Sequence, residues 1–490
     1  MNISIIGAGI GGLSAACLLA SKGHKVSVFE KNNSFGGKMN LVEAEGFRFD
    51  TGPSLFTMPE TLEALFTQCG TSLAEQLTLL PLTTNCRYTF ADGTRFDNHH
   101  TTEENLAEIK RIAPEDLEAY KEFLSYSENL FHKTEHAFIR NPLFDVSDFK
   151  NLVLPSFFGI DAFTTVSKRV DSYFKSPYLR QFFKRFTTYN GSSPFLAPAT
   201  LNVIPHIELN QGGYYVKGGL FKIAEALYNL TLSLGVEIHF DSEIKQVHTE
   251  NKRVSSIELI SGEKVSTSLI VANSDATETI TQLFDKDSIS HRKQQKAKSV
   301  EPSCSGFVLL LGINKKYEQI LHHNIFFSEN YEKEFEDLFV RKVMPEDPTI
   351  YIANTSFTDK EHAPEGSSNL FVLVNAPYLS DSFDWKDEAP SYANKIISIL
   401  EEKGLTELSS SIQFQKIITP QDFYTTYRSN KGSIYGTSSN SKFSAFVRPR
   451  NKSRLVDGLY FVGGSSHPGG GIPLVIQSAF NSVQLIERYE

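Results

Sequence analysis

The chain has 490 residues, 40% of them hydrophobic and 21% charged, as in an ordinary globular protein of roughly two or three domains. Its net charge of -9 and the lack of a long basic run argue against nucleic acid as the main partner. The four cysteines are far apart and form no CxxC pair, so neither a zinc site nor a disulfide framework is predicted. We expect reduced thiols in a cytoplasmic protein, without a signal peptide or a transmembrane helix.

The N-terminal segment predicts a dinucleotide-binding unit. An apolar run, Ile3 to Ile6, leads into Gly7-Ala8-Gly9-Ile10-Gly11-Gly12 and an Ala- and Leu-rich stretch, and a second apolar run ends on Glu30. Strand, glycine turn, helix, strand and acidic residue is the order of a nucleotide-binding βαβ unit. A glycine-rich turn without a nucleotide is the alternative, and the flanking elements together with Glu30 argue against it.

Each residue of this unit has its own predicted role. Gly7 permits the tight turn, Gly9 lets the backbone approach a pyrophosphate, and Gly12 lets the helix pack closely against the strand. The N-terminus of the helix offers free N–H groups to the phosphates. Glu30 lies at about the offset at which a carboxylate reaches a ribose hydroxyl, and its charge disfavours the 2′-phosphate of NADP.

A second glycine turn, Gly36-Gly37, follows the acidic residue and is itself followed by Lys38. Such a turn lets the chain pass close to the ribose and pyrophosphate of an extended ligand, and Lys38 adds a cation there. This segment therefore favours FAD over NAD.

The rest of the chain alternates between strand and helix patterns. Asp92-Gly93 between two alternating runs predicts a hairpin over 87–96, and a helical pattern covers 102–140, with Pro114 near a helix start. Further helices are predicted over 220–234 and 474–487, and further strands over 236–240, 254–259, 264–271, 307–311, 349–353 and 370–374. The 38 Phe and 19 Tyr residues fit either core packing or an aromatic-lined tunnel for a long apolar ligand.

Together, these motifs resemble a known family. The segments GAGIGGLSAA, VFEKNNSFGGKM and FRFDTGPS, together with residues 212–219, 271–275 and 459–473, are similar to FAD-dependent carotenoid desaturases of the bacterial phytoene desaturase type. These enzymes are relatives of the flavin amine oxidases, and the resemblance spans almost the whole chain. It implies an α/β fold with a Rossmann-like FAD-binding domain, an inserted mixed-sheet substrate domain and a helical lid or membrane-associating region.

The resemblance also implies how the chain divides into domains. The FAD-binding domain is expected to be discontinuous and to comprise residues 1–75, 210–295 and 450–490. Residues 76–100 and 296–449 are expected to form the substrate-domain sheet, and residues 101–209 the helical region.

FAD is the implied cofactor. The residues expected to contact it are Gly7, Gly9, Gly12, Glu30, Lys31, Gly37, Lys38, Pro53, Ser54, Val247, Asn273, Gly463, Gly471 and Ile472. Among these, Val247 is expected to offer its backbone amide and carbonyl to the adenine. The C-terminal helix is expected to face the flavin with its N-terminus.

The implied reaction introduces a C=C bond into a long polyene by hydride transfer to flavin N5. Because the flavin and the conjugated substrate carry most of this chemistry, we predict no catalytic side chain, and no metal-ligand spacing is present. Tyr189 and Asn190 are expected to line the substrate tunnel and to hydrogen-bond an oxygenated end group, with an ordinary turn as the alternative. His467 is the third residue expected at the substrate tunnel, either as a polar contact or as a structural part of the flavin-proximal loop.

Four segments refine the expected reaction. GPSLFTMPE, CRYTFADGT, TYNGSSPF and TLNVIPHIE are most similar to hydroxycarotenoid 3,4-desaturases, so we expect desaturation of a 1-hydroxycarotenoid. A multi-step phytoene-type desaturase is the alternative within this chemistry. A redox-neutral carotenoid isomerase and a prenyl-lipid escort protein are alternatives from other classes. The motifs do not indicate the electron acceptor.

The apolar run 152–160, followed by Lys168 and Arg169, has two interpretations. It either dips into the bilayer, with the basic residues at the headgroups, or it covers the substrate pocket. Since a carotenoid must enter from lipid, we expect a cytoplasmic protein that associates peripherally with the inner face of the membrane.

Overall fold

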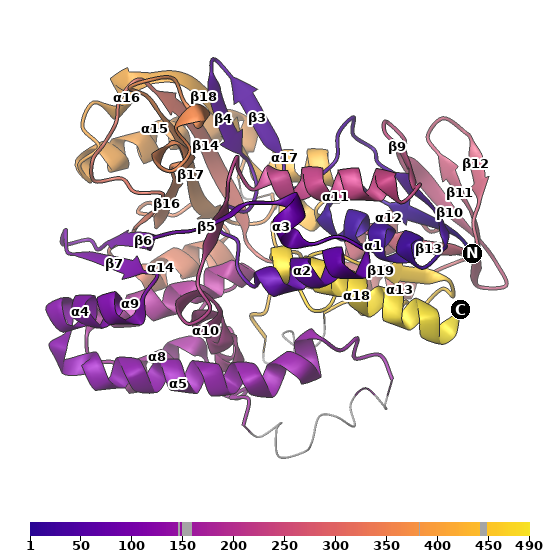
Figure 1. The fold of residues 1–490 in the computed structure, drawn as a ribbon, viewed down its shortest axis with the longest axis horizontal. Coiled ribbons are helices and arrows are strands. Elements are labelled where there is room, and N and C mark those ends of the chain that lie inside the picture. The colour runs from indigo at the N-terminus through magenta and orange to yellow at the C-terminus, as the bar shows by residue number, and fades with distance from the viewer. Residues whose placement is uncertain (146–147, 149–158, 382, 442–447) are drawn as a thin grey trace.

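The computed structural model describes residues 1–145, 148, 159–381, 383–441 and 448–490. Three regions make up the molecule (Figure 1). A parallel sheet with its helices lies on the right, next to both termini, and a mixed sheet lies at the upper left. A helical region lies below the mixed sheet.

A five-stranded parallel sheet, in the order β19-β13-β1-β2-β9, is the centre of the first region in the described part of the chain. Its strands are β1 (Asn2–Ile6), β2 (Lys25–Phe29), β9 (Glu237–His239), β13 (Leu269–Ala272) and β19 (Leu459–Phe461). The central strands are apolar along most of their length because helices pack on one face of the sheet and a small antiparallel sheet packs on the other. The predicted strand–turn–helix–strand order at the N-terminus is confirmed.

Helix α1 (Ile10–Ser21) is buried from Ile10 to Leu19 because it lies against the sheet and between two other helices. These neighbours are α11 (Phe221–Ser233) and α18 (Ile472–Tyr489), both of which were predicted, although α18 begins slightly earlier than expected. The small Ala and Gly residues of α1 allow this close packing. The other helices beside this sheet are α2 (Pro59–Gln68), α3 (Leu73–Gln76), α12 (Ala276–Gln282) and α13 (His291–Lys298).

Three smaller sheets complete the strand pairing in the described residues. They are the antiparallel sheet β10 (Ile244–Glu250), β11 (Arg253–Leu259) and β12 (Lys264–Ser266), and the pairs β3 (Leu41–Ala44) with β4 (Phe47–Asp50) and β5 (Leu79–Pro81) with β8 (Tyr214–Val216). One of them, β3 with β4, packs on the mixed sheet. The predicted strand 264–271 is divided between two sheets. Its first part, β12, is largely exposed, whereas its second part, β13, is fully buried in the parallel sheet.

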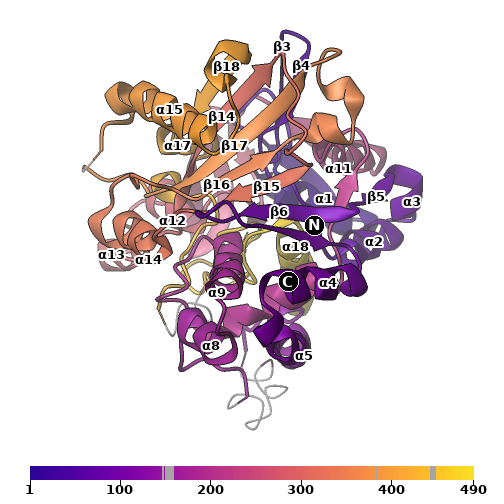
Figure 2. The ribbon, with the colours of Figure 1, turned by 90° about the vertical axis from the view of Figure 1, so that its left-hand side faces the viewer.

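A seven-stranded mixed sheet, in the order β18-β14-β17-β16-β15-β6-β7, dominates the second region as described (Figure 2). Its strands are β6 (Thr84–Thr89), β7 (Arg95–His99), β14 (Ser305–Ile313), β15 (His323–Phe326), β16 (Ile350–Ala353), β17 (Ser368–Ala376) and β18 (Ile412–Ile418). The predicted strands at 307–311, 349–353 and 370–374 are thus confirmed. One face packs on helix α15 (Trp385–Glu402).

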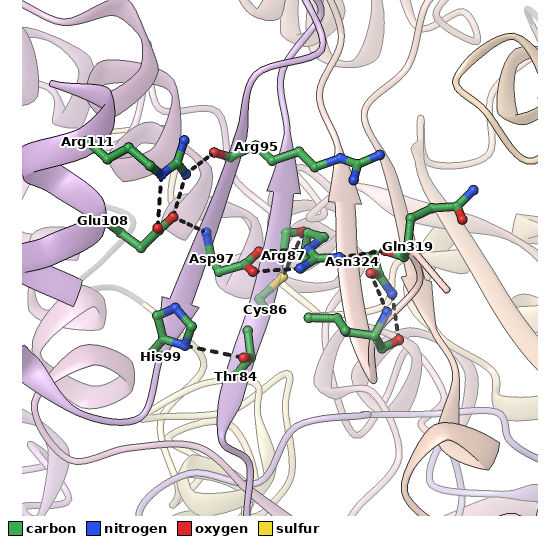
Figure 3. A network of polar contacts seen from close by, with 11 residues as sticks. Thr84, Cys86, Arg87, Arg95, Asp97, His99, Glu108, Arg111, Gln319 and Asn324 are labelled. Atoms are coloured by element: carbon green, nitrogen blue, oxygen red, sulfur yellow. Dashed lines mark hydrogen bonds and ion pairs between the residues drawn. The ribbon is translucent and has the colours of Figure 1, made fainter. Parts of the chain in front are cut away.

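The predicted hairpin is formed by β6 and β7, and polar contacts hold it in place (Figure 3). The guanidinium of Arg87 donates two hydrogen bonds to the Asp97 carboxylate, at 2.7 and 2.8 Å, and a third to the carbonyl of Gln319. Glu108 of the neighbouring helix accepts the backbone N–H of Asp97. These bonds therefore attach the hairpin both to the sheet and to the helical region, and they hold β6 in one orientation.

The third region consists of helices and short turns. They are α4 (Thr102–Ile112), η1 (Pro114–Asp116), α5 (Leu117–Thr134), η2 (Glu135–Ile139), α8 (Val166–Tyr173), α9 (Pro177–Lys184), η3 (Arg185–Asn190), η4 (Ala199–Val203) and α10 (Ile204–Leu209). The predicted helix over 102–140 is interrupted before Pro114, since proline has no backbone N–H to continue α4. Their apolar faces, rich in Phe and Tyr, form a common core with the β6–β7 hairpin.

The remaining elements are short and connect the mixed sheet to its surroundings: α14 (Tyr331–Glu336), η5 (Asp337–Arg341), η6 (Thr355–Phe357), η7 (Lys360–His362), α16 (Leu408–Ser411), α17 (Pro420–Tyr427) and η8 (Asn430–Gly432). Most of the apolar run 152–160 lies outside the described residues. Of the helices that are described, none is long and apolar enough to cross a membrane. The predicted domain boundaries stay a prediction; β6 and β7 share a sheet with strands of the 296–449 segment.

Candidate functional site

A cavity of about 900 Å³ extends from the glycine turn after β1 to the face of the mixed sheet opposite α15. Most of the predicted site residues line it: Gly7, Gly9, Glu30, Lys31, Gly37, Lys38, Pro53, Ser54, Asn273, Gly463, Gly471, Ile472, Tyr189, Asn190 and His467. The segments that carry these residues are far apart in the sequence. The fold therefore joins the predicted nucleotide site and the predicted substrate tunnel in a common space.

The glycine turn is built as predicted. Gly7 has a φ of 92°, which a side chain would strain. A Cβ at Gly12 would lie 2.1 Å from the carbonyl oxygen of Gly7, so only glycine lets α1 approach β1 this closely. Gly12 itself is absent from the cavity lining, in agreement with its predicted packing role.

Asn273 follows β13 and occupies the space that these glycines leave. A Cβ at Gly9 would lie 2.7 Å from its Nδ2, and a Cβ at Gly463 would lie 2.7 Å from its Oδ1. Three chain segments thus meet at this amide. Helix α1 begins just after, at Ile10, and no side chain caps its N-terminus, so its first N–H groups are free to bind phosphate oxygens.

Glu30 shapes the turn from the end of β2. Its carboxylate is only 6% exposed and accepts the backbone N–H of Ala8 at 2.8 Å and that of Asn32 at 2.9 Å. Each carboxylate oxygen can accept further hydrogen bonds. Glu30 therefore holds the turn and lines the cavity, where a ribose hydroxyl would fit.

The two predicted lysines have mainly structural contacts. Lys31 donates to the carbonyl of Thr425 at 2.7 Å, and Lys38 donates to the carbonyls of Ser433 and Ile434 at 3.1 and 3.0 Å. Burial lowers the pKa of Lys38 to about 8, against the opposing effect of Asp275. Both lysines line the cavity while they tie the segment after β18 to the nucleotide end.

The prediction for Val247 is wrong. Its side chain is fully buried in the core below β10, and its backbone N–H donates to the carbonyl of Leu283 at 2.8 Å, so this N–H is unavailable to an adenine. Ile244 and Lys245, earlier in the same strand, line the cavity instead. The pairing of β10 with β11 is irregular between Ile244 and Gln246, which sets the residues of β10 that face the cavity, and no pattern in the sequence predicts this register.

The three predicted tunnel residues lie in the cavity wall but have internal partners. The Tyr189 hydroxyl donates to Glu208. The Asn190 amide donates to the Ser439 hydroxyl and accepts from Arg448. The His467 ring is bonded to the carbonyl of Asn141 at 2.8 Å, and burial lowers its pKa to about 4. His467 is therefore neutral near pH 7 and holds its loop.

Several polar residues of the wall were not singled out from the sequence. They are Asn85, Arg185, Glu208, His323, Tyr351, Tyr435 and Arg448. Each lies in a segment whose pattern predicts only a strand, a helix or a loop. The apolar wall between them is formed by Val308, Ile325, Phe371 and Leu373 of the mixed sheet.

Arg448 is the most unusual of these residues. It is 6% exposed, and none of the described carboxylates forms an ion pair with it. Its guanidinium donates instead to the carbonyls of Tyr435 and Gly464, at 3.3 and 3.2 Å. Burial lowers its pKa to about 10. It joins the segment before β19 to the loop that follows it.

No group of three or more His, Cys, Asp or Glu side chains suited to a metal ion occurs among the residues that the structure describes. The free N–H groups at α1, the close-packed glycines and the carboxylate of Glu30 all fit the adenosine and pyrophosphate parts of a dinucleotide. The cavity continues beyond them along Pro53, Ser54 and Gly463 to Ile472, as an extended cofactor such as FAD requires.

Comparison with known proteins agrees with this assignment. Residues 10–486 match the family model described as flavin containing amine oxidoreductase. The 4,4'-diaponeurosporene oxygenase of Staphylococcus haemolyticus (strain JCSC1435) is 36% identical over 492 residues, which cover 100% of this chain and 97% of that protein.

Solved structures share the fold. An oxidoreductase from Methanosarcina mazei superimposes with a TM-score of 0.66 at 16% identity, covering 99% of this chain and all of that one. A Rab GDI from Plasmodium falciparum reaches a TM-score of 0.56 at 12% identity, with 98% and 97% covered. These likenesses confirm the predicted fold class, whereas the family match confirms FAD and the enzyme class. The chain therefore belongs to the flavin containing amine oxidoreductase family, as an FAD-dependent oxidoreductase of the carotenoid desaturase type.

Proposed function

We propose that the protein oxidises a long acyclic carotenoid near one end of its polyene chain. The observation that carries this proposal is the continuity of the cavity, which leads from the nucleotide end to an apolar wall on the mixed sheet. The relative from Staphylococcus haemolyticus, named for a carotenoid and similar over its whole length, supports the substrate class.

In this reaction the bound FAD supplies a hydride acceptor. The chain's own residues bind and orient the reactants. Val308, Ile325 and Leu373 offer the apolar contact that a polyene needs and exclude water from the reacting carbon. His467 is neutral and bonded to a backbone carbonyl, so its task is to hold the loop at Gly463 to Ile472.

Two outcomes are possible at the oxidised carbon. Desaturation, as in the 3,4-desaturation of a 1-hydroxycarotenoid, is favoured by the resemblance of the segments around residues 54, 88, 189 and 203 to that subtype. Oxygenation of the chain end is favoured by the name of the relative. We propose 3,4-desaturation as the first candidate and end oxygenation as the second.

Product analysis tests both candidates. The FAD-loaded protein is incubated with lycopene, its 1-hydroxy derivative, phytoene and 4,4'-diaponeurosporene, and the products are identified by mass. Desaturation removes a pair of hydrogen atoms, whereas oxygenation adds oxygen. Conversion of phytoene alone would overturn both candidates in favour of a phytoene-type desaturase, and anaerobic turnover without flavin bleaching would indicate an isomerase. A protein without flavin would support a lipid escort.

We further propose peripheral attachment to the inner face of the membrane through the helical region. Two apolar side chains of this region are exposed, Phe163 (68%) and Leu196 (44%). They lie in two segments that are joined by a hydrogen bond from the Val166 N–H to the Ala197 carbonyl. Exposed Lys168 follows directly and suits anionic headgroups. Co-sedimentation with phosphatidylglycerol vesicles tests this surface.

In that experiment Phe163→Ser with Leu196→Ser should lower vesicle binding severalfold. The matched control is Phe357→Ser, which removes an aromatic side chain of intermediate exposure between those two (54%) from η6, beside the mixed sheet. Equal binding by all three proteins would rule out this surface.

A further inference from the structure

A buried ion pair lies in the wall of a cavity that otherwise suits a hydrocarbon. Arg185 of η3 and Glu208 of α10 are 3.3 Å apart, and their side chains are 8% and 2% exposed. Withdrawing both charges from water carries a desolvation penalty that apolar side chains of similar size would avoid. A polyene has no group that an ion pair could contact, so the pair points to a polar part of the ligand.

Other side chains extend this pair into a network. The Tyr189 hydroxyl donates to Glu208, and the Asn98 amide donates to Glu208 at 3.2 Å. Arg185 donates to the Tyr88 hydroxyl from two nitrogens and stacks on the ring of Tyr189 at 5.0 Å. Tyr189 therefore has a fixed position in the cavity wall, and its oxygen can still accept hydrogen bonds.

Tyr435 adds a donor to this part of the cavity. Its ring packs against Gly191, two residues after Tyr189. A Cβ at Gly191 would lie 2.6 Å from the Tyr435 ring, so the close contact requires glycine. The ring lines the cavity and keeps part of its surface open there. No residue in the described ranges hydrogen-bonds its hydroxyl, whereas the Tyr351 hydroxyl is bonded to Ser54 and to His323. The Tyr435 O–H is thus available to a ligand.

We propose that Tyr189, Glu208 and Tyr435 bind a hydroxyl group at one end of the carotenoid, while Arg185 holds Glu208 and Tyr189 in position. This inference rests on the proposed function and narrows its substrate to an alcohol. A hydroxyl donates one hydrogen bond and accepts others, so it can donate to Tyr189 or Glu208 and accept from Tyr435. A carboxylate end would place a second negative charge beside Glu208 and is disfavoured.

Binding of a matched ligand pair tests the site. Lycopene and 1-hydroxylycopene, which differ in their end group, are titrated in detergent micelles into the FAD-loaded protein, and the dissociation constants are read from flavin fluorescence. We expect the wild-type protein to bind the hydroxylated ligand roughly tenfold more tightly, because a lost hydrogen bond leaves buried polar groups unpaired.

The variants Tyr189→Phe and Tyr435→Phe each remove one hydroxyl and keep the ring. Each should reduce the preference for 1-hydroxylycopene roughly fivefold, measured as the ratio of the two dissociation constants in the same variant. The matched control is Tyr178→Phe, which breaks a tyrosine–carboxylate bond of 2.6 Å to Asp92, outside the cavity. FAD content and melting temperature verify that each variant is folded.

Equal binding of the two ligands by the wild-type protein would overturn this site and leave the proposed function standing. The same holds if both Phe variants keep the full preference, or if a carboxylate-ended carotenoid binds more tightly than the alcohol. Failure of the wild-type protein to bind or convert any carotenoid would overturn the proposed function itself.

Discussion

The two ends of the cavity are built in different ways. At the nucleotide end, the wall consists largely of backbone and glycine, with the free N–H groups of α1 and the carboxylate of Glu30 as its polar features. At the substrate end, the wall consists of side chains from β6, η3, α10, β15 and β16, including the buried pair Arg185 and Glu208. The first end recognises a ligand common to many enzymes through local geometry, and the second obtains its specificity from residues brought together by folding.

The largest effect is expected from a methyl group in the glycine turn. Gly12→Ala places Cβ 2.1 Å from the Gly7 carbonyl, so α1 must move away from β1. We expect a loss of about 5 kcal/mol, enough to prevent folding with bound FAD. The flavin-to-protein ratio and the melting temperature measure it.

The control is Gly464→Ala, also in the cavity wall, where the nearest atom to Cβ would be 3.4 Å away. This variant should keep its flavin. If both variants behave alike, backbone packing is not what distinguishes the nucleotide end.

Removal of one member of the buried pair tests the opposite end. Glu208→Ala leaves the Arg185 charge without its partner and should cost about 3–4 kcal/mol in urea unfolding. The flavin content should stay at the wild-type level, because Glu208 lies at the substrate end. Replacing both residues, as Arg185→Met with Glu208→Leu, should recover part of the stability.

Glu407→Ala is the matched control, because it breaks an exposed pair with Lys315 and should leave stability nearly unchanged. Loss of flavin together with stability in Glu208→Ala would show that the two ends do not act independently.

A pH-dependent effect is expected where the two ends meet, at His467. Burial, with a smaller contribution from the Arg448 charge, lowers its pKa in the folded protein to about 4, from 6.5 when unfolded. Between these values the unfolded chain binds more protons, so stability falls as the pH drops from 6.5 to 4, by about 3 kcal/mol. Urea unfolding across this range should show the slope in the wild-type protein and a smaller slope in His467→Asn. Equal slopes in the wild-type protein and in His467→Asn would show that His467 is not the source of this pH dependence.

The smallest effect is expected from Glu30→Gln. The amide keeps the size of the carboxylate but weakens the hydrogen bonds from Ala8 and Asn32. FAD affinity should fall about fivefold, a change of about 1 kcal/mol, as measured by fluorescence titration. Carotenoid binding by the flavin-saturated variant should be unaffected. An unchanged FAD affinity would show that Glu30 serves the turn alone.

The local parts of the site could be predicted because each depends on a few neighbouring residues. Gly7, Gly9 and Gly12 are required by a single turn, and the Asp92-Gly93 hairpin by its own backbone. The prediction for Val247 was wrong because the residues that β10 turns toward the cavity depend on an irregular pairing with β11. This irregularity leaves no pattern in the sequence.

The phosphate-binding turn could be derived from the sequence alone, since it is contiguous and its geometry follows from glycine. The substrate end follows only from the folded arrangement of distant segments. Arg185 and Glu208 belong to different helical segments, and Tyr435 approaches them from a loop near the end of the mixed sheet. Removing one partner of a buried ion pair leaves the other charge uncompensated, and the proximity of Arg185 to Glu208 arises from packing between distant segments.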